Sequence, residues 1–126
     1  MAKRVSMDIP GLVPHKNPIP QVSKVGNMIF SGAIVGYDAD GNIPETLDEQ
    51  TACAFANMRK MVEGAGAKLG DIGHITVFLA DTGNREPVNR EWLKLFPDEH
   101  DMPARHAVKS DLGGSMLIQL DFIAVL

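Results

Sequence analysis

The amino-acid sequence predicts an α+β fold, in which a mainly antiparallel mixed sheet carries two helices on one face. The spacing of apolar residues alternates between a period of two and a period of three to four. It gives the order strand, strand, strand, helix, strand, helix, strand, strand. Helices interspersed among such strands pack against one side of a sheet. In the last predicted strand, residues 115–125, one face is unbroken and apolar, whereas the other contains Gln119 and Asp121. That second face is left to solvent or to another subunit.

Length and composition limit the classes of protein to which the chain can belong. With 126 residues, of which 44% are hydrophobic and 22% charged, we expect a single globular domain over residues 1–126. Its 12 basic and 16 acidic residues give a net charge of −4, which offers no attraction to a phosphate backbone. The single cysteine cannot form an internal disulfide, and no apolar run approaches the roughly 20 residues of a membrane span. We therefore expect a cytoplasmic protein with neither a nucleic acid nor a membrane as partner.

The first third of the chain predicts short strands joined by turns. Residues 4–8 form a candidate edge strand, and the proline-rich residues 10–20 form a loop, because proline lacks a backbone donor. Residues 21–25 and 28–31 flank a Gly-Asn pair, which is a two-residue hairpin signal. Residues 33–37 make a third short run before a turn rich in Asp, Gly and Asn.

The remaining elements follow from periodicity and from residues that begin or end helices. Apolar side chains form one stripe over residues 46–68, which predicts the longest helix, with acidic residues at its start and Lys68 near its end. Residues 71–81 alternate as a strand, and Thr82-Gly83-Asn84 is expected to cap a second helix over residues 85–95. Residues 105–110 and 115–125 complete the sheet, with a Gly-Gly turn between them.

Few residues indicate a functional site when they are considered one at a time. Arg105 follows Pro103 at the start of a strand, where its guanidinium would match a carboxylate or would merely solvate the strand end. Gln119 and Asp121 either belong to a half-exposed sheet face or serve a site. Cys53 lies within the long helix and is expected to be a packed thiol. The four histidines have no metal-ligand spacing, and the glycines form no phosphate-binding loop.

Six segments in order resemble the RidA/YjgF family of reactive-intermediate (enamine/imine) deaminases, over about residues 16–125. They are the hairpin at 21–32, the helix at 50–68 with Asn57, the strand at 71–81, Val88-Asn89 with Phe96, Pro103-Ala104-Arg105, and the final strand through Ile123-Ala124-Val125. The resemblance implies a chorismate-mutase-like fold and a homotrimer with ligand sites between subunits. It also implies hydrolytic deamination of small carboxylated enamines and imines, without a cofactor.

The resemblance also implies roles for individual residues. Arg105 would hold the substrate carboxylate, and Gln119 would orient the attacking water, so these two are the expected catalytic residues. The expected substrate-binding residues are Ile19, Ser31, Gly32, Asn89, Ala104, His106 and Ala107. No metal site is expected.

The sequence departs from the family pattern at three of these positions. Gln119 replaces the family glutamate, Ile19 stands where a tyrosine is usual, and Ala107 stands where serine or cysteine is usual. An amide can orient water but cannot take its proton at neutral pH. Two alternatives therefore remain: an aminomuconate-like deaminase of aromatic breakdown, and a non-catalytic trimeric module that binds carboxylates or keto acids. Ribonuclease activity is disfavoured by the net charge.

Overall fold

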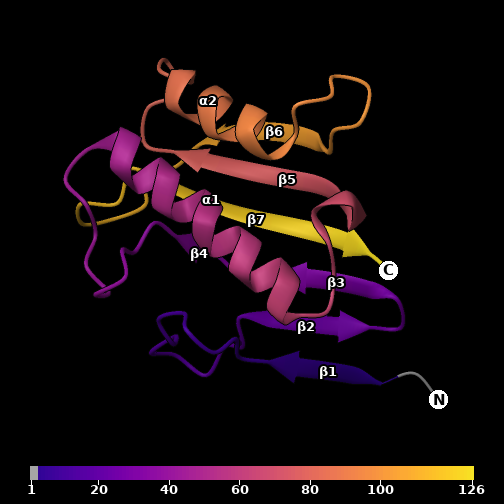
Figure 1. The fold of residues 1–126 in the computed structure, drawn as a ribbon. Helices are drawn as coiled ribbons and strands as arrows, with labels where there is room; N and C mark the ends of the chain where they lie inside the picture. The colour runs from indigo at the N-terminus through magenta and orange to yellow at the C-terminus, as the bar shows by residue number, and fades with distance from the viewer. Residues whose placement is uncertain (1–2) are drawn as a thin grey trace.

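The computed structural model describes residues 3–126, which form a seven-stranded sheet with both helices on one face (Figure 1). The main path of the sheet runs β1-β2-β3-β7-β5-β6, and β4 also pairs with β7. Neighbouring strands are antiparallel except for β5 and β6, which are parallel and connected through α2. The predicted α+β class is confirmed. The strands and helices are β1 (Arg4–Met7), β2 (Val22–Val25), β3 (Met28–Ser31), β4 (Ile34–Val35), α1 (Leu47–Gly64), β5 (Ile72–Leu79), α2 (Glu86–Leu95), β6 (Ala104–Lys109) and β7 (Ile118–Val125), with a 3-10 turn at Leu69–Asp71.

The core lies between the two helices and one face of the sheet. The alternate residues Ile118, Leu120, Phe122 and Ala124 of β7 are at most 1% exposed, as the alternation predicts. The stripe of α1 packs on them with buried side chains such as Phe55. No helix covers the other face of the sheet, where Ile123 is 37% exposed (Figure 1). This face is open to a ligand or to another subunit.

Helix α1 begins where the sequence predicts and ends four residues early. The Thr46 side chain accepts a hydrogen bond from the Glu49 backbone N–H and caps the first turn. At the other end Gly66 adopts a positive φ of 88°, and its N–H and that of Ala67 return to carbonyls of the last turn. This closure stops the helix at Gly64. The expectation that Lys68 belongs to the helix is therefore wrong.

Helix α2 is one residue shorter than predicted, because it starts at Glu86 and not at residue 85. Arg85 occupies the position before its first residue, and no side chain caps it. Thr82-Gly83-Asn84 does not cap the helix, because the Asp81 carboxylate accepts the Gly83 N–H at 2.8 Å and holds a separate turn. Pro87 fits the first turn of α2, where its missing donor has no effect.

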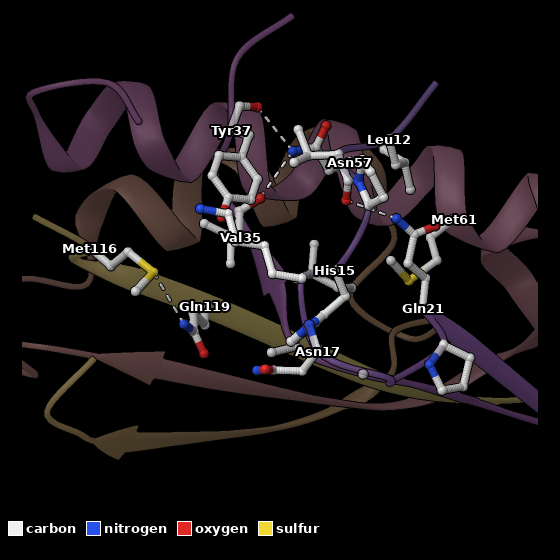
Figure 2. Close-up of a pocket in the computed structure, with 17 residues that line it drawn as sticks. Leu12, His15, Asn17, Gln21, Val35, Tyr37, Asn57, Met61, Met116 and Gln119 are labelled. Atoms are coloured by element: carbon white, nitrogen blue, oxygen red, sulfur yellow. Dashed lines mark hydrogen bonds between the residues drawn. The ribbon is translucent and has the colours of Figure 1, made fainter. Parts of the chain in front are cut away.

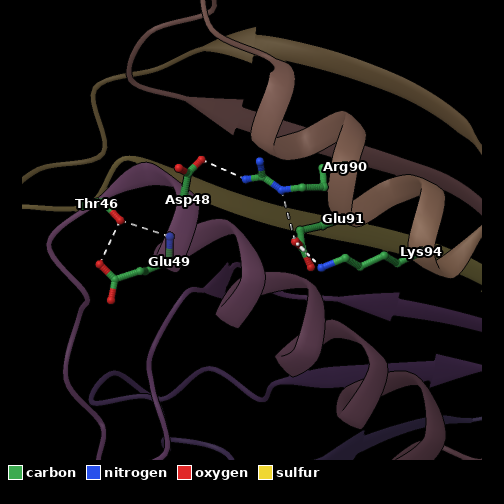
Figure 3. Close-up of polar contacts among 6 residues, drawn as sticks. All are labelled: Thr46, Asp48, Glu49, Arg90, Glu91 and Lys94. Atoms are coloured by element: carbon green, nitrogen blue, oxygen red, sulfur yellow. Dashed lines mark hydrogen bonds and ion pairs between the residues drawn. The ribbon is translucent and has the colours of Figure 1, made fainter.

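One ion pair joins the start of α1 to α2 on the outside of the molecule. Arg90 contacts the Asp48 carboxylate at 2.9 Å, and within α2 Glu91 accepts from Lys94 at 3.1 Å (Figure 3). Exposed pairs contribute little stability, so the buried Val88 and Trp92 matter more for seating α2. Their packing fixes α2 above the edge strand β6.

No helix within residues 3–126 is long and apolar enough to cross a membrane.

Candidate functional site

Arg105 lies on the edge strand β6 and faces the underside of α2. Its partner in the sheet is Ile75, which is completely buried on the helix-covered face. One guanidinium nitrogen, Nη2, donates to Oδ1 of Asn89 at 2.8 Å. The guanidinium carbon stands 4.9 Å from the centroid of the Trp92 ring, a cation–π distance. Residues one turn apart on α2 thus orient the guanidinium.

The electrostatic surroundings of Arg105 favour an anion. Partial burial, and secondarily the positive charge of Arg85, lower the pKa of Arg105, although an arginine stays protonated throughout the physiological range. Between residues 3 and 126, no Asp or Glu forms an ion pair with this guanidinium. A partly desolvated cation with an amide and an aromatic ring as partners is suited to binding a carboxylate.

A bulge in the sheet builds the second group of site residues. Phe30 is paired with Ile123, and Ile34 is paired with Leu120, so three residues of the chain from β3 to β4 oppose two residues of β7. The Ser31 hydroxyl accepts the Phe122 backbone N–H at 2.8 Å and satisfies a donor that the bulge would leave unpaired. Residues 31–33 therefore form a short irregular segment beside β7, which we call the wall.

Two cavities meet at this wall. The first, of about 360 Å³, lies between the proline-rich loop, β4 and α1 (Figure 2). The second, of about 370 Å³, opens on the helix-free face and is lined by Ser31, Phe78 and Asp121 among others. Three residues contribute to the lining of both cavities: Gly32, Ala33 and Gln119. The Gln119 amide donates to the Met116 sulfur at 3.3 Å, which directs its nitrogen toward the first cavity.

Side-chain amides hold the first cavity open. The Gln21 carbonyl oxygen accepts the Ile9 N–H at 2.6 Å, and its amide nitrogen donates to the Val13 carbonyl at 2.9 Å. Asn57 of α1 donates to two carbonyl oxygens of the segment that contains β4, those of Val35 and Tyr37, both at 3.0 Å (Figure 2). These bonds fix the loop and β4 at the distances that leave the cavity between them.

The predicted site residues separate into distinct groups. Arg105 and Asn89 are in contact, whereas Ser31, Gly32 and Gln119 gather around the second cavity on the opposite face of the sheet. Ile19 is 48% exposed and lines neither cavity. Ala104 and His106 are exposed on β6, and Ala107, paired with the buried Val77, shares the face of Arg105.

The structure adds residues that sequence reasoning did not identify as part of a site. His15, Asn57 and Met116 line the first cavity, together with Gln119. The run of prolines around His15 indicates an ordered loop, but nothing in it says which surface the loop covers. Across residues 3–126, no cluster of three or more His, Cys, Asp or Glu side chains is placed to hold a metal ion.

Comparisons with known proteins relate this geometry to a family. The family model described as Endoribonuclease L-PSP matches residues 14–126. The chain is 34% identical to a RutC family protein of Pyrococcus abyssi over 110 residues, which cover 85% of each sequence. It is 33% identical over 111 residues to a 2-iminobutanoate/2-iminopropanoate deaminase of Escherichia coli, covering 86% of this chain and 87% of the relative. The crystal structure of the YjgF gene product of E. coli superposes with a TM-score of 0.86 at 27% identity, covering 96% of this chain and 98% of that one.

Proposed function

This chain belongs to the endoribonuclease L-PSP family, which includes the RidA/YjgF proteins, and from that membership we propose that it hydrolyses carboxylated imines and enamines. The products are a 2-keto acid and ammonia. The relative named 2-iminobutanoate/2-iminopropanoate deaminase, at 33% identity, supports a deaminase role. The structural feature that carries the proposal is the Arg105 guanidinium, held by Asn89 and Trp92 with no acidic partner in residues 3–126.

The reaction that we propose needs few groups from the protein. An enamine first takes a proton on carbon and becomes the protonated imine. Water adds through oxygen to the carbon of the protonated imine, the carbon–nitrogen bond breaks, and both protons of the water leave with nitrogen as ammonium, the protonated form of ammonia. A protonated imine is already electrophilic, so positioning of the carboxylate and of the water provides much of the acceleration. Arg105 would fix the carboxylate, and the Gln119 carbonyl oxygen would accept a hydrogen bond from the water.

A single protomer does not present these two groups to one ligand. Arg105 pairs with Ile75, and Gln119 pairs with Phe78, three residues further along β5, so their side chains leave opposite faces of the sheet. We therefore propose a homotrimer in which the Arg105 of one copy meets the Gln119 of the next. The uncovered sheet face, with Ile123 37% and Val125 44% exposed, offers apolar surface for such an assembly.

The test is a coupled assay in which an amino-acid oxidase generates the imino acid and formation of the keto acid is followed. We expect the protein, at catalytic concentration, to accelerate hydrolysis above the spontaneous rate. The Arg105→Ala variant should fall to that background. Arg59→Ala provides the matched control, because Arg59 is an exposed arginine of α1 with a single 3.8 Å contact to Glu63. Equal activity in Arg105→Ala and the wild type would refute the assigned role.

A binding module without catalysis gives a different result in the same experiments. It would show no acceleration, while pyruvate and other keto acids would still bind beside Arg105. Trp92, the single tryptophan of the chain, lies against that guanidinium and would report binding through its fluorescence. Acceleration that depends on Arg105 distinguishes the deaminase from such a module.

A further inference from the structure

We propose that the first cavity is a side-chain pocket, and that it makes the protein selective for 2-imino acids with long apolar side chains, such as those related to leucine, methionine and phenylalanine. This inference rests on the proposed deaminase function. It goes further because it assigns a ligand class to a cavity that lies between the proline-rich loop, β4 and α1 (Figure 2).

The position of the cavity connects it to the reacting group. Gln119, which would orient the water, lines this cavity as well as the open one on the helix-free face. The other residues that line both are Gly32, which has no side chain, and Ala33, which has a single methyl group. The two spaces therefore adjoin at the backbone of residues 32–33 and at Gln119, which is the one long side chain that lines both. An imine carbon placed beside Gln119 can direct its substituent into the first cavity.

The lining is suited to an apolar substituent. The aliphatic and thioether side chains of Leu12, Val35, Met61 and Met116 contribute to it. Two of the amide groups that also line it are already engaged, since Gln21 bonds to the Ile9 and Val13 backbone and Asn57 to the carbonyls around β4. Methionine side chains adapt to ligands of different shape. A substituent that enters the cavity exchanges water for apolar contacts, and the Gln21 and Asn57 amides keep their hydrogen bonds.

The size of the cavity argues against a methyl or ethyl substituent as the preferred occupant. Its volume of about 360 Å³ lies within the range of pockets that enclose drug-sized ligands. A methyl or ethyl group would leave most of that space to water. An isobutyl, thioether or benzyl group would bury several more carbon atoms, and each contributes to the stability of the bound state.

The experiment compares two groups of imino acids in the coupled assay, normalised to the rate at which the oxidase supplies each imine. One group derives from alanine and 2-aminobutanoate, and the other derives from leucine, methionine and phenylalanine. We expect kcat/KM for the bulky group to exceed that for the small group by about tenfold or more. The Val35→Phe substitution, which places a ring in the cavity, should lower this ratio by about the same factor.

The control is Val5→Phe, because Val5 lies on the edge strand β1 and is 52% exposed, far from the lining. It should leave the ratio unchanged. If circular dichroism shows that Val35→Phe does not fold, Val13→Phe at the 39% exposed rim serves as the second variant. A preference for the small imines, or a ratio that neither cavity variant alters, would overturn the proposal.

Failure of the deaminase function gives a separate result, since no imine of either group would then be hydrolysed faster than spontaneously. In that case calorimetry with pyruvate, 4-methyl-2-oxopentanoate and phenylpyruvate decides on the cavity. Tighter binding of the two bulky keto acids, weakened by Val35→Phe, supports the pocket. Equal affinities for all three would contradict it.

Discussion

Arg105 and Gln119 lie on strands that flank the same central strand, β5, yet their side chains leave the sheet from opposite faces. Arg105 is paired with Ile75 in parallel register, and Gln119 is paired with Phe78 in antiparallel register. Residues separated by three positions on a strand point to opposite sides. Under the proposed function, the cation that would bind the carboxylate and the amide that would orient the water come from two copies of the chain.

Restoring a carboxylate at position 119 should accelerate hydrolysis. In the Gln119→Glu variant, the side chain can accept a proton from the attacking water, which the amide cannot. We expect kcat to rise by about tenfold and to increase with pH as the new carboxylate loses its proton. The pH–rate profile of the coupled assay measures both effects. The apolar Gln119→Leu variant, whose side chain can neither accept a hydrogen bond nor orient water, is the control and should be nearly inactive. A lower rate in Gln119→Glu than in the wild type would contradict the assigned role of this residue.

Removing the amide that orients Arg105 should weaken carboxylate binding without abolishing it. Asn89→Ala deletes the 2.8 Å hydrogen bond to the guanidinium, while Trp92 continues to stack on it. Because Asn89 is exposed, we expect the Kd for pyruvate to rise only several-fold, about 1 kcal/mol. Titration of Trp92 fluorescence provides the measurement. Asn84→Ala changes another exposed asparagine near α2 and should leave the Kd unaltered; equal effects of the two substitutions would exclude a positioning role for Asn89.

The buried Gln50 should be important for stability. Its amide nitrogen donates to the carbonyls of Pro44 and Ser115, both at 2.9 Å, and its oxygen accepts the Leu117 N–H at 2.8 Å. The Gln50→Leu variant leaves these backbone groups unpaired, and we expect a loss of about 2–4 kcal/mol in the free energy of unfolding. Urea denaturation of this variant and of Asn84→Ala measures the difference. A loss under about 0.5 kcal/mol, as for typical surface substitutions, would show that the bonds are replaced by water.

Cys53 should react slowly with alkylating reagents. Burial, and secondarily the negative charges of Asp38 and Glu49, raise the pKa of this thiol above its ordinary value. A raised pKa reduces the fraction of thiolate at a given pH, so the rate should stay low at pH 8 and should increase only above the ordinary range. The rate with iodoacetamide, compared with glutathione and with the urea-unfolded protein, provides the check. Glu49→Gln removes one charge and should increase the rate modestly. A folded protein that reacts faster than glutathione would contradict a raised pKa of the Cys53 thiol.

Local patterns in the sequence predict which segments form strands and helices, but they do not predict which elements lie next to one another in space. The alternation along β7 correctly predicts which residues are buried. Successive side chains of a strand point to opposite faces, and only one face of β7 is turned toward the core. The end of α1 is missed because the apolar stripe does not mark the last helical residue, while the closing turn depends on the positive φ of Gly66. The parallel pairing of β5 with β6 depends on the path of α2, which no short pattern encodes.

The candidate site shows the same division. Arg105 is recognisable from its strand position after a proline and from the family resemblance, but its contacts with Asn89 and Trp92 depend on how α2 packs. The first cavity forms because the loop around His15 lies close to α1 in space. The two segments are far apart in the sequence, so no local pattern predicts that they meet. The hydrogen bonds of Asn57 that fix this arrangement are likewise long-range.

In the proposed trimer, the Arg105 of one copy and the Gln119 of another form one catalytic site. Mixing two inactive variants, Arg105→Ala and Gln119→Leu, by co-expression or by refolding together, tests this arrangement. In a trimer with sites between subunits, a site whose Arg105 comes from one variant and whose Gln119 comes from the other is intact. Random mixing in equal amounts should restore about a quarter of the wild-type activity, while each variant alone remains at background. If the mixture is no more active than its components, Arg105 and Gln119 do not meet across an interface, and the proposed site between subunits is refuted.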